Sequence, residues 1–371
     1  MKFSNLYPKR VTAYLLLTFI LGCSAKDEEI EPIIDPSPSP AYVYLDENGV
    51  TMKAGEDSQP GDTAIFDGDS YLIVDNETLR KLVLGYPNNG VDLSKLVTSK
   101  VTNMSWVFQK PGYNADLSNW DVSNVTDMSH MFQGANGFHS DISKWDVSSV
   151  TDMSYMFDNA AVFNWDISEW DVSSVTNMKA MFNGAESFNQ DLKDWETSSV
   201  TDMSRMFERA ESFNGEIGNW NTSSVISFWG MFAYASSFNA EIGEWNTSNA
   251  EDMGIMFRSA EAFNQNISNW DVSNVTGMLG MFAFAKHFNQ DISNWNVSNV
   301  IYMNLMFARA ENFNSEIGQW DVSSVEDMEG MFASAWKFNQ DLSQWNVEKV
   351  SEHENFSNDA TSWTLPKPNF N

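Results

Sequence analysis

The sequence predicts an α/β repeat solenoid, leucine-rich-repeat-like, with short strands and short helices in each 25-residue coil. Two periodic features carry this prediction. A Met-Phe pair recurs nine times, from Met131-Phe132 to Met331-Phe332, and columns of Ala and Phe keep the same period. Constant apolar columns mean that each unit follows the same path and packs against the next. Tryptophan also recurs every 25 residues, at Trp120, Trp145, Trp170, Trp195, Trp220, Trp245, Trp270, Trp295, Trp320 and Trp345.

The chain begins with a segment typical of a secretion signal. Basic residues within 1–10 precede the apolar stretch 11–21, which is too short to cross a bilayer as a mature helix. The stretch leads into Gly22-Cys23, which resembles the bacterial lipobox, where a small residue precedes a cysteine that is acylated. Because Cys23 is the only cysteine in the chain, its position at this junction favours lipidation. We expect residues 1–22 to be removed and Cys23 to anchor the protein in a membrane.

Residues 23–40 are predicted to form an acidic, proline-rich tether. Lys26 is followed by three acidic residues, which resembles the export tag of surface-exposed lipoproteins in the Bacteroidota; a simple acidic spacer is the alternative. We expect a location at the outer membrane, facing the cell exterior. Prolines then form a semi-rigid spacer, with Pro32, Pro36, Pro38 and Pro40 as its members.

Residues 41–96 are predicted to form a small α+β cap that covers the first coil. Asp75 or Asn76 can cap a short helix through Leu84. A cap is needed because an open first coil would leave apolar edges exposed to aggregation. Two pairs of alternating runs flank dipeptides that favour hairpin turns: residues 42–45 and 50–53 around Asn48-Gly49, and residues 63–66 and 71–74 around Asp67-Gly68.

Residues 97–346 contain one partial and nine full units of the repeat. In the unit that begins at Trp145, apolar residues between 150 and 160 follow the three-and-four spacing of one helical face, which predicts a short helix. The run 142–147 has the spacing of a leucine-rich-repeat strand, which predicts a strand at Trp-Asp-Val. Residues 347–371 lose the Met-Phe pair and are predicted to form a closing C-terminal cap.

An asparagine column is the most regular polar column of the repeat, and His139 interrupts it in the first full unit. We predict a buried ladder in which each side chain satisfies backbone groups at a turn, since buried polar backbone groups need partners. Ligand binding is the alternative interpretation. The column consists of Asn164, Asn189, Asn214, Asn239, Asn264, Asn289, Asn314 and Asn339.

The repeat motif resembles a known family. Over about residues 97–345 the pattern is Val-Thr-Asp-Met-Ser-x-Met-Phe-x-x-Ala-x-x-Phe-Asn-Gln-Asp-Ile-Ser-x-Trp. It resembles the surface-lipoprotein repeat that other bacteria share with mycoplasmas and that is grouped with BspA-like leucine-rich-repeat surface proteins. Better-known members of that group are associated with adhesion to host or matrix proteins and to other bacteria. The resemblance implies a cell-surface location and adhesion, although Trp and Met replace most of the leucines here.

Composition and motifs argue against several function classes. Acidic residues outnumber basic ones 51 to 21, and the net charge is −30, so we expect no nucleic-acid partner. No paired-cysteine or His-Glu-x-x-His motif accompanies the four histidines, so we expect neither a metal nor a cofactor. Motifs for nucleophilic or phosphate chemistry are lacking too. A recurring acidic column, from Asp141 to Asp341, is interpreted as a solvated stripe, with a weak calcium ladder as the alternative. We therefore expect no enzyme.

Five large side chains occupy variable columns in which other units carry Ser, Glu, Ala or Gly. Such side chains frequently anchor protein or glycan ligands when they lie on a surface; local packing between coils is the alternative. We hypothesise that they form part of an adhesive patch for an extracellular protein or glycan. The second function class is an accessory glycan- or nutrient-binding scaffold lipoprotein of an outer-membrane uptake system. The five residues are Trp229, Tyr234, Phe284, His287 and Trp336.

Overall fold

The computed structural model describes residues 40–86, 90–108 and 114–370. These residues belong to one compact unit that begins at Pro40. The predicted signal peptide, Cys23 and the predicted tether as far as residue 39 lie outside the described residues. Within the described ranges, no helix has the length and apolar character that crossing a membrane requires.

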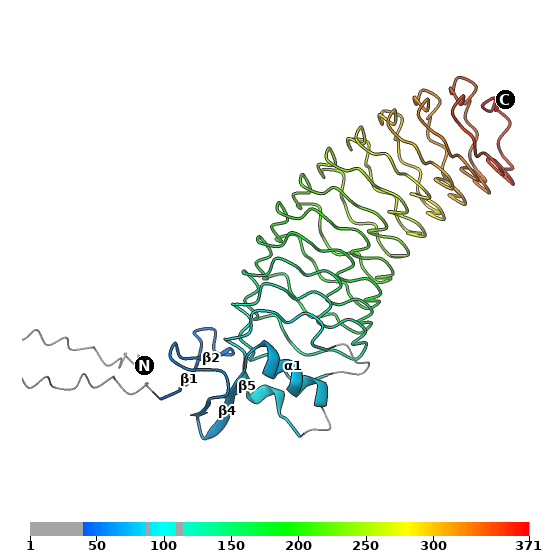
Figure 1. The fold of residues 1–371 in the computed structure, drawn as a ribbon. Helices are drawn as coiled ribbons and strands as arrows, with labels where there is room; N and C mark the ends of the chain where they lie inside the picture. Colours follow the sequence, from blue (N-terminus) through cyan, green and yellow to red (C-terminus); the bar gives the residue numbers. More distant parts are fainter. Residues whose placement is uncertain (1–39, 87–89, 109–113, 371) are drawn as a thin grey trace, which may run out of the picture. The chain divides into compact units, whose positions relative to one another are not determined.

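The N-terminal part of this unit contains all of its named helices and strands (Figure 1). Asp67-Gly68 forms the turn of the second hairpin with φ angles of 51° and 84°, which such residues tolerate better than most. Asp75 caps the helix by accepting a hydrogen bond from the Thr78 N–H at 2.8 Å. The elements are β1 (Val43–Leu45), β2 (Met52–Ala54), β3 (Thr63–Phe66), β4 (Asp69–Ile73), α1 (Asn76–Gly85), the 3-10 helix η1 (Leu93–Lys95) and β5 (Leu96–Val97).

The two predicted hairpins and the predicted helix are present in this part. Strand β1 pairs with β2 in antiparallel fashion, and β3 does so with β4. Strand β5 then adds to β4 in parallel, with Ile73 opposite Val97. The chain leaves β5 directly into the first coil, so the three-stranded sheet leads into the repeats.

After Val97 the chain forms a stack of similar coils, which follow one another from cyan to red in Figure 1. Successive coils are joined by single parallel bridges, from Asn103 with Asp127 to Asp327 with Glu352. The repeat architecture is thus present. The α/β description is wrong, because the described residues beyond Val97 contain no α-helix and no strand longer than one bridge.

The helix predicted over residues 150–160 is replaced by consecutive turns. Tyr155 and Asn159 have φ angles of 57° and 59°, which a right-handed helix excludes. Alternate N–H groups donate to the next coil: Tyr155 to the Lys179 carbonyl at 2.8 Å and Phe157 to the Met181 carbonyl at 2.8 Å. The apolar spacing that predicted a helix therefore comes from turns that alternate inward and outward.

The strand predicted at residues 145–147 is also absent. Parallel pairing occurs instead at Asp152, seven residues after the tryptophan, where the chain bridges to Asp127 and Asn177. The leucine-rich-repeat spacing was misleading because Trp145 is held by its side chain rather than by a backbone ladder. Its indole N–H donates to the Leu117 carbonyl of the preceding coil at 3.1 Å.

The same indole hydrogen bond recurs at all ten periodic tryptophans. Each Nε1 donates to a backbone carbonyl of the preceding coil at 2.8–3.2 Å, and each ring is at most 4% exposed. Several adjacent rings are stacked, as in Trp220 and Trp245, whose centroids lie 6.2 Å apart with planes at 2°. Each tryptophan thus fills the core and satisfies a buried donor in the same contact.

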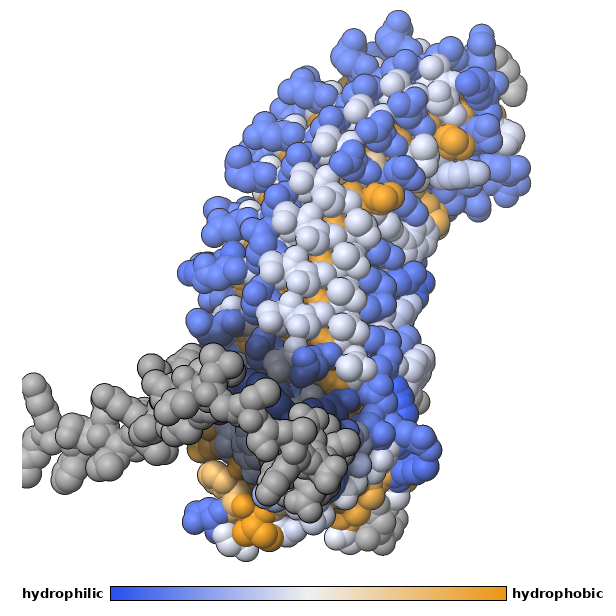
Figure 2. All heavy atoms as spheres, turned by 60° about the vertical axis from the view of Figure 1, so that its left-hand side comes forward, coloured by the Kyte–Doolittle hydropathy of each residue, from blue (hydrophilic) through white to orange (hydrophobic). Residues whose placement is uncertain are grey.

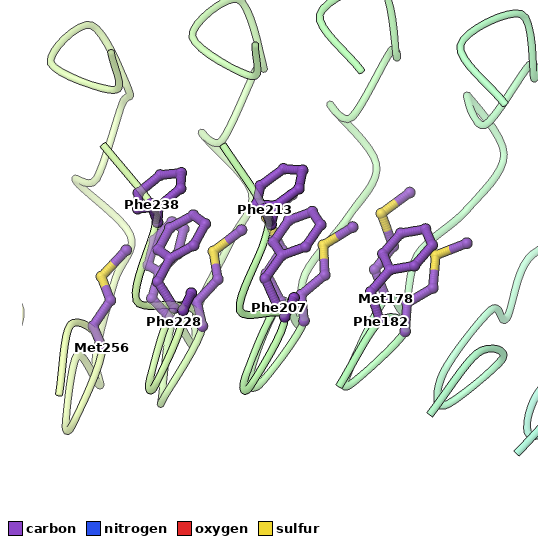
Figure 3. Packing of buried hydrophobic residues seen from close by; sticks show 14 of the residues in the cluster. Met178, Phe182, Phe207, Phe213, Phe228, Phe238 and Met256 are labelled. Carbon is purple, nitrogen blue, oxygen red and sulfur yellow. The ribbon is translucent and has the colours of Figure 1, made fainter. Parts of the chain in front are cut away.

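Phenylalanine and methionine fill much of the rest of the core, together with Val, Ile, Leu and Ala (Figure 3). Within one coil the rings of Phe207 and Phe213 stack at 3.9 Å, and Phe207 stacks on Phe232 of the next coil at 5.8 Å. Burying one such ring contributes about 1.5–3 kcal/mol. Because each ring contacts rings on both neighbouring coils, one coil alone would leave much of this surface exposed.

The segment predicted as a C-terminal cap contains a further coil. Residues 351–363 keep the turn pattern of the repeats. Phe356, Ala360 and Trp363 are buried in the columns that hold Met, Ala and Phe elsewhere. A short closing segment follows, in which the Pro366 carbonyl accepts the Leu342 N–H at 2.9 Å. The backbone therefore forms one more coil after the last Met-Phe pair.

Candidate binding surface

The asparagine column forms a hydrogen-bonded ladder. From Asn164 to Asn314, each Oδ1 accepts the backbone N–H of the asparagine one coil later at 2.7–2.9 Å, and the Oδ1 of Asn339 accepts the Thr364 N–H at 2.8 Å. The prediction that this ladder is buried is wrong, because its side chains are exposed or only partly buried. The column lies on the outer side of a turn, where the amide groups bind the backbone and still meet solvent. Its geometry accounts for the residues without a ligand.

The recurring acidic column also shapes turns. The Asp291 carboxylate accepts the Ser293 N–H at 2.9 Å, and Asp341 accepts the Ser343 N–H at 3.0 Å. These backbone hydrogen bonds, with help from the serine side chains, lower the pKa of both carboxyl groups. In the described ranges, no three His, Cys, Asp or Glu side chains are arranged to hold a metal ion.

Positions within a coil are numbered here from its tryptophan, which is position 0. The five predicted patch residues fall at different positions. Tyr234 and Phe284 occupy position 14 of two coils, and Trp229 occupies position 9. His287 and Trp336 occupy positions 17 and 16, on the following turn. The structure therefore links only part of the predicted set.

Tyr234 and Phe284 belong to a row that we call the arginine-aromatic stripe, with one residue from each of five successive coils. The Arg209 guanidinium lies over the Tyr234 ring, 5.2 Å from its centroid. Arg258 donates from Nε to the Tyr234 hydroxyl at 3.1 Å and lies 5.4 Å from the Phe284 centroid. Arg309 lies 5.4 Å from the same centroid. Cations and rings thus alternate along the stack.

The backbone conformation at position 14 is energetically unfavourable for the large side chains of this stripe. Its φ is positive in every coil from Trp120 onward, and small residues such as Gly134, Gly184 and Ser259 occupy it in several coils. Tyr234 and Phe284 adopt φ angles of 63° and 62° there, a conformation that costs a non-glycine residue about 1–3 kcal/mol. Because the same turn forms with glycine or serine, the fold does not require the large side chains at this position.

The charge along the stripe is uneven. Glu208 lies 3.5 Å from Arg205 and 4.0 Å from Arg209. Burial raises the pKa of the Glu208 carboxyl, while the two arginines act against that rise. Arg258 and Arg309 form no ion pair with any carboxylate in the described residues. The half of the stripe around Phe284 therefore retains uncompensated positive charge.

Trp229, predicted for the patch, is involved in packing between coils. A Cβ atom at Gly254, one coil later, would overlap the Trp229 ring. The glycine therefore makes room for the indole, which is only partly exposed. For this residue the packing alternative describes the observed contact.

His287 and Trp336 lie on a different turn. The His287 Nδ1 donates to the Glu261 carbonyl at 2.8 Å, and its ring lines a shallow polar groove with Asn289 and Lys337. Trp336 is 46% exposed. These two residues are surface features, but no contact of theirs joins the stripe.

Sequence reasoning missed the arginines of the stripe. The chain has six arginines, and four of them fall between Arg205 and Arg309. That clustering was a usable signal, especially in so acidic a chain. What the sequence could not give is that Arg258, at position 13, reaches two rings at position 14 of the neighbouring coils.

Figure 2 shows one face of the stack, where a band of weakly polar side chains runs beside hydrophilic ones.

A family model described as "Mycoplasma protein of unknown function, DUF285" matches residues 78–195, 185–291 and 256–369. The three matches overlap and follow the repeats, which agrees with a repeat protein of a type shared with mycoplasmas. Searches of curated proteins and of solved structures gave no match.

Proposed function

Since the chain belongs to the DUF285 family, whose function is unknown, we propose that it is a non-catalytic surface lipoprotein whose solenoid binds an extracellular ligand. The observation that carries this proposal is the arginine-aromatic stripe. Large side chains there occupy strained backbone positions that glycine or a smaller polar residue, such as Gly184 or Ser259, fills in other coils. The stack holds its shape with glycine at this position, so binding supplies a reason for the larger residues.

The proposed location rests on the N-terminal sequence. A basic segment, a short apolar stretch and Gly22-Cys23 support acylation of Cys23 and anchoring at the outer membrane, facing outward. The BspA-like grouping and an adhesive role form part of the same proposal, supported by the repeat motif. Metabolic labelling with a fatty acid tests the anchor: wild type should incorporate the label, and Cys23→Ser should not. Equal labelling of both would refute the lipidation.

An accessory role in glycan capture is the second candidate. The groove beside His287 favours it, because the amide side chains of Asn264, Asn289 and Asn312 line this hollow with Lys337. Amide groups can both donate and accept hydrogen bonds, which suits sugar hydroxyls. On this reading the groove, rather than the stripe, would contact the ligand.

Binding of intact cells to panels of matrix proteins and glycans tests the proposal. The stripe variant is Tyr234→Ser with Phe284→Ser, since serine is native at position 14 in Ser259 and Ser334. The control is Tyr302→Ser, which removes a ring that is 50% exposed at another position. We expect the stripe variant to lose binding and the control to keep it. Equal binding by both, at the same surface level, would contradict a role for the stripe.

A further inference from the structure

We infer that the arginine-aromatic stripe binds a linear acidic polysaccharide whose carboxylate or sulfate groups recur along the chain. This inference rests on the proposed ligand-binding function and names the class of ligand. It starts from the charge of the stripe. In a chain with 51 acidic residues, Arg258 and Arg309 have no carboxylate partner within the described residues. Such groups are free to bind an anion from outside.

The rings hold these guanidinium groups in place. Phe284 lies between Arg258 and Arg309, each 5.4 Å from its centroid, and the Tyr234 hydroxyl also binds Arg258. Stacking fixes the plane of a guanidinium while leaving its N–H edges available for bidentate contacts to carboxylate or sulfate. Less side-chain entropy is then lost when an anion binds.

The spacing of the arginines favours a polysaccharide. Arg209, Arg258 and Arg309 belong to every second coil, so neighbours are separated by about 10 Å, twice the spacing of paired strands. In an extended acidic peptide, side chains on one face recur every two residues, or about 7 Å. When every second sugar carries an acid group, the charges are a disaccharide apart, a length comparable to the two-coil step.

The rest of the surface contributes selectivity. With a net charge of −30, the protein as a whole repels a polyanion, and the arginines of the stripe provide local attraction within that surface. A ligand of high charge density, such as a nucleic acid, would extend past the arginines, and its outer phosphates would be repelled by the acidic surface around the stripe. A polysaccharide with sparse charges that follows the row can place its anions on the arginines.

The test measures binding of the full-length protein, solubilised in detergent, to four immobilised polymers. Chondroitin carries carboxylates on alternate sugars, chondroitin sulfate adds sulfates, dextran is neutral and poly-glutamate is an acidic peptide. We expect binding to one or both chondroitins that weakens as salt is raised, and much weaker binding to dextran and poly-glutamate. Preference between the two chondroitins tells which acid group is recognised.

The main variant is Arg258→Ala with Arg309→Ser, which introduces residues that other coils carry at the same positions, such as Ala283 and Ser334. Loss of two charge-assisted hydrogen bonds predicts at least about tenfold weaker chondroitin binding. The control is Lys144→Asn with Lys349→Ser, which removes the same charge from other columns and should change the affinity less than about twofold.

A second variant, Arg258→Lys with Arg309→Lys, keeps the charge but loses the planar stacking group, and we expect intermediate affinity. Three results would overturn the inference: no chondroitin binding, equal binding to poly-glutamate or dextran, or equal loss in main variant and control. If the variants instead lose binding to a neutral glycan or a matrix protein, the inference fails while the proposed function stands. Matching thermal unfolding of all variants excludes misfolding as the cause.

Discussion

Positions 12 and 14 lie two residues apart in every coil, yet they follow different rules. Position 12 is phenylalanine in all nine full units, and every one of these rings is fully buried. Position 14 is occupied by Gly184 in one coil and Phe284 in another, with almost the same φ, 67° and 62°. The interior column at position 12 therefore sets the backbone path. Position 14, which we call the corner of the coil, can vary in sequence. Departures at the corner are where chemistry can be added without changing the fold.

The largest predicted effect comes from the interior column. Phe232→Ala removes a ring that stacks on Phe207, Phe238 and Phe257. We expect a loss of about 3–5 kcal/mol in the free energy of unfolding, as for other buried phenylalanines. Chemical denaturation measures it. A loss below about 1 kcal/mol would mean that the rings do not hold the stack together.

A smaller loss is expected at position 0. Trp245→Phe removes the indole N–H that donates to the Ile217 carbonyl at 3.1 Å. The phenyl ring fills less of the space and leaves one buried hydrogen bond unmade, so we expect about 1–3 kcal/mol of destabilisation. Denaturation of this variant beside Phe232→Ala gives the ranking. A larger loss here than at Phe232 would reverse the expected order.

At the corner, replacement should barely affect stability. Phe284→Gly relieves the positive φ angle of 62°, which favours folding, but it loses ring contacts with Arg258 and Arg309. Because the two effects oppose each other, we expect a net change within about 1 kcal/mol. The same variant should show reduced chondroitin binding. Strong destabilisation would show that the corner belongs to the folding core.

The smallest expected effect comes from two aspartates whose surroundings shift their pKa values in opposite directions. Hydrogen bonds from Ser293 lower the pKa of Asp291, whereas burial raises the pKa of Asp252. The stabilisation from Asp291 is present above the unfolded pKa and is lost as pH falls through the folded one. The penalty from Asp252 is present above its folded pKa and is relieved as pH falls through it.

Asparagine substitutions separate these two contributions. Asp252→Asn should stabilise the protein at pH 7 by a few tenths of a kcal/mol, and the gain should fade in acid. Asp291→Asn copies Asn266, which makes the same turn, and should give no gain at pH 7. Unfolding curves at several pH values measure both variants. The same pH dependence for both would contradict the difference in environment.

The sequence predicted the repeat, the hairpins around Asn48-Gly49 and Asp67-Gly68, and the helix that Asp75 caps, because each depends on local chemistry or on strict periodicity. It misassigned the interior of the coil. Apolar residues three and four apart suit a helix, but they equally suit successive turns whose side chains alternate. The sign of φ at Tyr155 decides between them, and a tyrosine gives no hint of it.

The candidate site was predicted in part. Tyr234 and Phe284 stood out because they break a column, and the structure joins them through Arg258. That contact connects residues from three coils and depends on side-chain direction, which one sequence does not reveal. The asparagine ladder was predicted with the right partners but the wrong burial, since regular spacing indicates bonding between coils and not which side faces water.

Units 25 residues apart lie directly side by side in the stack, and cross-linking tests this arrangement. In a Cys23→Ser background, which has no other cysteine, Thr151→Cys with Thr176→Cys places two thiols on adjacent coils, where the Thr176 N–H donates to the Thr151 carbonyl at 2.9 Å. Mild oxidation should join this pair, because neighbouring strands lie within disulfide range. Thr151→Cys with Thr201→Cys, two coils apart, should stay reduced. Cross-linking of the distant pair in preference to the near one would contradict the stacked-coil account.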